Sequence, residues 1–235
     1  MGKLIKLEWR KNRISRYVRN AAFLAVVLGA FIFALAFLGI ANDPNTGVPD
    51  MAPGHEGISS AIELFTAMSY LVFTSVMLST FIISSYKNGT MALMFSYPIK
   101  RQKILASQML AVWIICFTAM TLTKIFLYGC IWLGAQFMNS SFLLDFAMGS
   151  AGFYCQAAVQ SAVTVSMGFT ALFVGLLTKS SKAAIVFSFV LFFLTQANVG
   201  ELTLANNAIF PAILTAASLL FAFFTVFFSE TKGLI

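Results

Sequence analysis

Charge is what this sequence has least of. Only 10% of its 235 residues are Asp, Glu, Lys or Arg, whereas 60% are hydrophobic. A soluble domain carries about a quarter charged residues, so this chain has too few to cover the surface of a soluble protein of its length. The scarcity of charge therefore excludes an ordinary soluble domain and indicates an integral membrane protein.

Motifs for enzyme chemistry are missing as well. The sequence has no GxxxxGK[ST] nucleotide loop, no HExxH zinc motif and no GxSxG nucleophile turn. Its single histidine, His55, cannot form a histidine cluster, and its three cysteines lie in apolar runs without metal-ligand spacing. We therefore expect a chain that is not an enzyme, with no metal site and no cofactor of its own.

Proline is scarce too, with five residues, and the apolar runs are long and continuous. Strands of a membrane barrel would show segments of about ten residues with alternating polarity. Here the runs are about twenty residues long, the length at which a helix crosses a hydrocarbon core of ~30 Å. The sequence therefore predicts one all-α membrane domain over residues 1–235 with six transmembrane helices. The predicted spans are 21–41, 61–85, 104–133, 151–177, 183–199 and 208–228.

Lysine and arginine are unevenly distributed along the chain. Seven precede the first span, four lie in 86–103, two follow the fourth span and one is in the tail, which makes 14 of the 15. The loops after the first, third and fifth spans contain acids and no cation. Because cytoplasmic loops carry the excess of Lys and Arg, we expect both termini in the cytoplasm of a bacterial cell. The net charge of +7 is then explained without nucleic acid.

Residues 3–19 combine an apolar helical face with a basic stripe. The basic stripe contains Lys6, Arg10, Arg13 and Arg16. This pattern predicts an amphipathic elbow helix in the membrane interface, with its cations near anionic lipid headgroups. A solvated basic leader that only sets the topology is the alternative.

The candidate functional residues inside the predicted spans are Glu63, Lys124, Gln156 and Gln160. Ionisable groups within a membrane span are costly and often functional. Glu63 is expected near the outer end of the second span, wetted by headgroups. Lys124 lies ~30 Å along the third span, which is within snorkelling range of the outer interface. An ion pair between Lys124 and Glu63 is the alternative, since both residues lie in the outer halves of their spans. Gln156 and Gln160 share a helical face and either line a polar seam for translocation or hydrogen-bond between helices.

The stretch YKNGTMALMFSYPIKR between the second and third spans reads as a short helix. Gly89 precedes Thr90, which can cap its start, and Pro98 prevents its continuation. Met94 and Phe95 contribute to an apolar side. A short apolar helix held below the membrane by basic residues suits insertion into a groove on a soluble partner. An interfacial elbow that binds nothing is the alternative.

This stretch resembles the segment between the second and third spans of type-2 ABC exporter permeases. A pattern close to E-x-x-x-G-T-x-x-x-L-x-x-x-P-x-x-R recurs there, and Gly89, Thr90, Pro98 and Arg101 match it. The acid of that pattern is absent, since SYK occupies residues 85–87. Two stretches, EWRKNR before the first span and YPIKRQKIL before the third, are most similar to the bacitracin- and lantibiotic-resistance branch of these permeases.

The resemblance implies a permease subunit of an ABC exporter. Such permeases pair with a second copy or homologue and bind ATP-binding cassette subunits, so ATP and Mg would belong to the partner chain. Residues 86–101 would be the coupling helix, and the substrate an amphipathic peptide, antibiotic or lipid-like molecule. A membrane anchor or accessory subunit for a soluble partner is the alternative. An ion-coupled transporter would need a charged midplane site, which the sequence does not offer.

Overall fold

The computed structural model describes residues 9, 14–37, 58–83, 101–138, 149–178, 180–196 and 209–231. Over these ranges the chain is all-α, as predicted, with six α-helices and one π-helical turn. The helices are α2 (Ile14–Phe37), α3 (Ile58–Leu78), α6 (Arg101–Met138), α7 (Ala151–Leu177), α8 (Ser181–Gln196) and α9 (Ile209–Thr231). The π-helical turn η1 (Ser79–Ile83) continues α3 directly.

Four stretches are long and apolar enough to cross a membrane. They are Ile14–Phe37, Ile58–Ile83, Gln102–Gln136 and Ala151–Leu177. Among the described residues, α8 and α9 contribute the shorter apolar stretches Ser181–Thr195 and Ile213–Phe227. The 38 residues of α6 rise about 57 Å, so α6 must tilt or project beyond the ~30 Å hydrocarbon core. The protein is therefore a multi-pass membrane protein.

The predicted and observed helix boundaries agree best where polar residues or glycine interrupt the apolar sequence. The fourth predicted span, 151–177, coincides with α7. The first predicted span begins at residue 21, whereas α2 begins at Ile14, so residues 14–19 of the predicted elbow helix continue into the span without interruption. No glycine or proline stands near that point to end a helix. Lys6, Arg10 and Arg13 lie outside the described residues.

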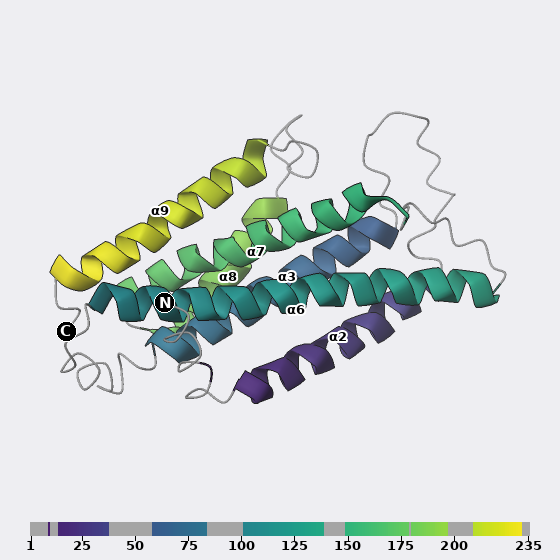
Figure 1. Ribbon diagram of the computed structural model, residues 1–235, viewed down its shortest axis with the longest axis horizontal. Coiled ribbons are helices and arrows are strands. Elements are labelled where there is room, and N and C mark those ends of the chain that lie inside the picture. Colours follow the sequence, from purple (N-terminus) through teal and green to yellow (C-terminus); the bar gives the residue numbers. More distant parts are fainter. Residues whose placement is uncertain are drawn as a thin grey trace.

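The helices form a bundle in which successive helices run in opposite directions (Figure 1). α3 and α7 lie side by side in the interior, and α6 packs against both of them. α2 flanks α6, α8 packs on α3 and α7, and α9 packs on α7 and α6. One end gathers the starts of α2, α6 and α8 with the ends of η1, α7 and α9 (Figure 1).

This end is called the basic end, because described cations stand near the starts of its helices. They are Arg16 and Arg19 on α2, Lys103 on α6 and Lys182 on α8. The opposite end, where α3 and α7 begin and α2 and α6 finish, is called the far end. Lys124 is the cation of the described residues that does not belong to the basic end.

The main apolar cluster lies toward the basic end, between α3 with η1, α6 and α7. Its members include Met77, Leu78, Phe81, Leu105, Met109, Val112, Phe169 and Leu172. Two glycines of α7 permit close approach there. A Cβ at Gly175 would lie 2.6 Å from both Ile83 Cδ1 and Ala184 Cβ, and one at Gly168 would lie 2.7 Å from Thr74 Cγ2. The basic end is therefore packed too tightly to accept even one added methyl group without a shift.

The outer faces of the bundle are apolar as well. Phe23 and Phe37 on α2, Phe193 on α8 and Phe223 on α9 are all more than half exposed. Such a surface is poorly hydrated in water but suits a helix bundle solvated by lipid tails. The exposed side chains therefore agree with the membrane assignment made from helix length.

Candidate functional site

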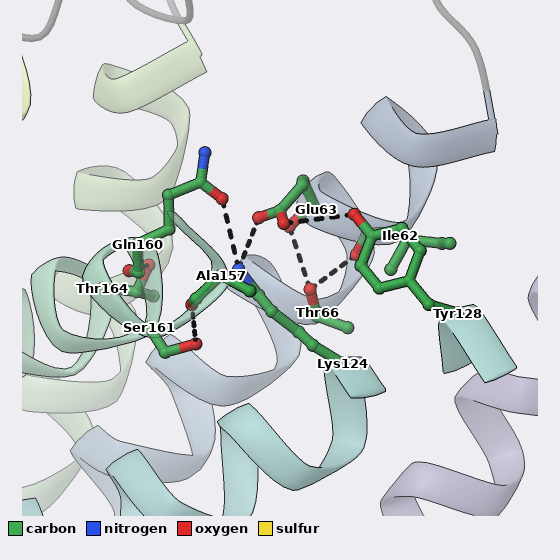
Figure 2. A network of polar contacts seen from close by, with 9 residues as sticks. All are labelled: Ile62, Glu63, Thr66, Lys124, Tyr128, Ala157, Gln160, Ser161 and Thr164. Atoms are coloured by element: carbon green, nitrogen blue, oxygen red, sulfur yellow. Dashed lines mark hydrogen bonds and ion pairs between the residues drawn. The ribbon is translucent and has the colours of Figure 1, made fainter. Parts of the chain in front are cut away.

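Lys124 on α6 and Glu63 on α3 form an ion pair toward the far end of the bundle (Figure 2). The Lys124 Nζ lies 2.5 Å from Glu63 Oε2. The lysine side chain is 0% exposed, whereas that of the glutamate is 29% exposed. Lys124 thus points into the bundle instead of snorkelling outward. Pairing inside the bundle offsets part of the desolvation penalty of its charge.

Tyr128 follows Lys124 by one helical turn and binds the same carboxylate. Its hydroxyl donates to Glu63 Oε1 at 3.3 Å. The ring packs edge-on against Phe153 of α7, with centroids 4.7 Å apart. Tyr128 was not among the site residues predicted from the sequence. Its spacing of four residues from Lys124, which places both side chains on one face of α6, was the available signal.

Gln160 brings the third helix, α7, into this group. In one amide orientation its Oε1 lies 3.3 Å from Lys124 Nζ. Turned by 180°, the amide nitrogen donates to Glu63 Oε1 at 2.9 Å and also to Oε2. In either orientation Gln160 contacts the pair. Gln156, one turn earlier on α7, is exposed, and no contact within the described residues joins it to the pair.

Polar contacts continue along the α3–α6 interface toward the basic end. The Tyr70 hydroxyl lies 2.6 Å from Thr123 Oγ1 and donates to the Ala119 carbonyl at 3.3 Å. Further along, Cys116 Sγ lies 3.6 Å from Met77 Sδ. On α3 these contacts recur every seven residues from Glu63, which is two helical turns and therefore one face. Tyr70 was not among the predicted site residues, because a spacing of seven from Glu63 does not by itself mark an uncharged residue.

The group offers a neutralised ion pair rather than a reactive centre. Among the described residues, no three His, Cys, Asp or Glu side chains gather as metal ligands would. The carboxylate of Glu63 accepts from protein donors on two other helices. The arrangement holds α3 and α6 together by an ion pair and joins α7 to them through the Gln160 amide.

The predicted partner-binding segment falls almost entirely outside the described residues. This applies to Gly89, Thr90, Met94, Phe95 and Pro98. Arg101 is the first residue of α6. The described neighbours of the segment along the chain are η1 and α6, whose adjoining ends both lie at the basic end (Figure 1). The basic end is therefore where the chain leaves and re-enters the described bundle around this segment.

Fold and site together define a multi-pass, all-helical membrane protein with an ion pair inside its bundle. The chain is a distant homologue of "Uncharacterized protein YcbO" of Bacillus subtilis (strain 168). The two are 25% identical over 95% of this chain and 96% of that protein. No protein-family model matches the chain, and no solved structure matches it. The similarity therefore extends over the whole length and leaves the function to be argued from the residues.

Proposed function

We propose that this chain is the transmembrane permease subunit of an ABC exporter. It would move an amphipathic peptide, antibiotic or lipid-like substrate out of the cell with ATP hydrolysed by a separate subunit. The match of Gly89, Thr90, Pro98 and Arg101 to the coupling segment of type-2 permeases carries this proposal. The multi-pass helical bundle is the kind of scaffold that such a subunit needs.

The topology we propose has six spans and both termini in the cytoplasm. The alternating helix directions support it, because they bring the described cations other than Lys124 to one end (Figure 1). By the positive-inside rule that end faces the cytoplasm of a bacterial cell membrane. The 23 residues of α9 rise about 35 Å and α8, with 16, about 24 Å. α9 is long enough for a span, and α8 is a short one.

The proposed partners come from the resemblance, and the proposed orientation indicates where each would bind. An ATP-binding cassette subunit would dock at the basic end on Met94 and Phe95, and it would hold ATP and Mg. A second permease copy or homologue would complete the transport path. The basic residues Lys6, Arg10, Arg13 and Arg16 would lie near anionic lipid headgroups, and Arg16 is exposed on α2 as this requires.

One observation favours a second function, that of a membrane anchor or accessory subunit without transport. The carboxylate of Glu63 is occupied by donors of its own chain. Saturated buried polar groups rigidify a core, which suits a static scaffold. On this alternative the segment 86–101 would still bind a soluble partner, but no substrate would move.

Co-purification with the genomically adjacent ATP-binding subunit tests the proposal. We expect a stable complex with ATPase activity in wild type, and at least a tenfold loss of complex in Phe95→Asp with Arg101→Glu. His55→Asp, in a loop expected on the other side of the membrane, is the charge-changing control and should leave the complex intact. Each variant is first checked for monodisperse elution.

If no ATP-binding subunit co-purifies, or if the double variant binds as wild type does, the exporter proposal fails. If a complex does form, ATP-dependent uptake of a fluorescent amphipathic peptide into inverted vesicles separates the exporter from the anchor. A complex that hydrolyses ATP without moving the peptide or any other amphiphile would favour the anchor.

A further inference from the structure

One polar group joins three helices at the far end of the bundle. Glu63 of α3 accepts from Lys124 and Tyr128 of α6, and Gln160 of α7 contacts the same pair (Figure 2). These donors come from the chain itself, so the group is a contact between helices and not an open ligand site. Any separation of α3 from α6 at this end must break the ion pair.

The other end of α3 is built differently. There the helix passes into η1, where Phe81, Ile82 and Ile83 are almost completely buried. η1 packs against α7 and α8, and Gly175 permits that close approach. π-helical turns are rare and occur frequently at functional sites, where they let a helix change its course locally. η1 also immediately precedes the segment we assign to contact with the ATP-binding subunit.

A purely structural role explains the ion pair poorly. Apolar residues of similar volume often hold a buried site as well as a charge pair does, or better. A charge pair differs in that its two charges, once separated, need water or new polar partners. The 29% exposure of Glu63 provides a side from which water can reach the pair once it separates.

We propose that Glu63, Lys124 and Gln160 form a far-end latch whose release lets the outer end of the bundle open. This inference rests on the proposed exporter function, because only a transporter needs its outer end to open. Closure of the ATP-binding subunits would act on the segment after η1, and α3 would carry the displacement to Glu63. Interfaces between packed helices favour such discrete rearrangements over continuous deformation.

Thiol labelling of a reporter cysteine tests the latch. Ala157→Cys is suitable, since Ala157 is 4% exposed and lies beside the group on α7 (Figure 2). The variant is built with Cys116, Cys130 and Cys155 replaced by Ala, and labelled with a membrane-impermeant maleimide in lipid nanodiscs. Both ends of the bundle are accessible in a nanodisc, so the result does not depend on orientation.

We expect slow labelling with the latch intact and labelling at least tenfold faster in Glu63→Gln. The charge-swapped variant, Glu63→Lys with Lys124→Glu, should restore slow labelling, which a merely misfolded bundle would not do. Tyr70→Phe removes a hydroxyl from the same interface outside the latch and should label as slowly as the parent. Unchanged labelling in Glu63→Gln, or fast labelling in the charge-swapped variant, would overturn the latch.

The exporter function is tested separately in the same preparation. Trapping a bound ATP-binding subunit with vanadate should accelerate labelling of the parent. If Glu63→Gln labels fast but no ATP-binding subunit binds, the ion pair closes the far end, but the exporter proposal fails and the latch role falls with it. If the subunit binds and hydrolyses ATP but trapping leaves labelling slow, the exporter stands and the latch role falls.

Discussion

The two ends of α3 are held in place by different forces. At the basic end, η1 lies in a cluster of large apolar side chains, and Gly175 lets α7 and α8 approach it closely. At the far end, Glu63 meets Lys124 from α6 and Gln160 from α7. Dispersion contacts fall off steeply when close-packed groups separate, whereas the attraction within an ion pair falls slowly with distance and depends on what solvates the separated charges. The basic end therefore depends on close packing, whereas the far end depends on a pair of charges, on which the proposed latch is built.

The largest expected effect comes from removing the carboxylate at the far end. Glu63→Ala leaves the fully buried Lys124 without its counter-charge. Breaking a buried pair in this way costs about 3–5 kcal/mol of unfolding free energy. The effect is measured by SDS titration of the purified protein in detergent, with helicity as the signal.

The double variant Glu63→Leu with Lys124→Met is the matched control. It removes both charges and fills similar volume, and replacing a buried pair by apolar residues is often neutral or stabilising. We expect it to recover most of the stability that Glu63→Ala loses. If the double variant is as unstable as the single one, charge is not what holds the far end, and the contrast between the two ends disappears.

The next effect is at the basic end. In Gly175→Ala the new methyl group would lie 2.6 Å from Ile83 Cδ1 and Ala184 Cβ. Overpacking of this kind costs about 1–3 kcal/mol. Gly129→Ala on α6 is the control, because nothing lies within 4 Å of its added Cβ. The same SDS titration should show a loss for Gly175→Ala and none for Gly129→Ala, and equal midpoints would mean that close packing is not what holds η1.

The positions of the apolar helices were predictable from the sequence, because polar residues interrupt the long apolar runs. The predicted span 151–177 coincides with α7, since polar residues and Gly149 mark its start and a polar turn follows it. The start of α2 was missed, because basic residues indicated an interface while nothing in the backbone required a break. A change of polarity therefore did not mark the start of this helix.

The contacts within the site were less predictable than the spans. Glu63 and Lys124 are separated by 61 positions, and only the packing of α3 on α6 brings them together. Distance along a helix gave the depth of Lys124 but not its direction, so snorkelling and pairing both fitted the sequence. Tyr70 was hidden because a tyrosine in an apolar span carries no charge to mark it.

The smallest effect is expected between the two ends, where Tyr70→Phe removes one hydroxyl from the α3–α6 interface. The buried ring would keep its packing against Phe73, with centroids 5.9 Å apart in the parent. What is lost is the contact with Thr123 and the bond to the Ala119 carbonyl. Hydrogen bonds between membrane helices average about 0.6 kcal/mol, so we expect a loss of roughly 0.5–1 kcal/mol.

Tyr154→Phe, on an exposed position of α7, is the control for Tyr70→Phe and should leave the SDS midpoint unchanged. A loss for Tyr70→Phe close to that of Glu63→Ala would change the interpretation of α3. The polar contacts from Glu63 to Met77 would then act as one cooperative network. The contrast between polar and apolar contacts would then lie between two faces of α3 and not between its two ends. The polar face is turned toward α6, and the close-packed face is turned toward α7.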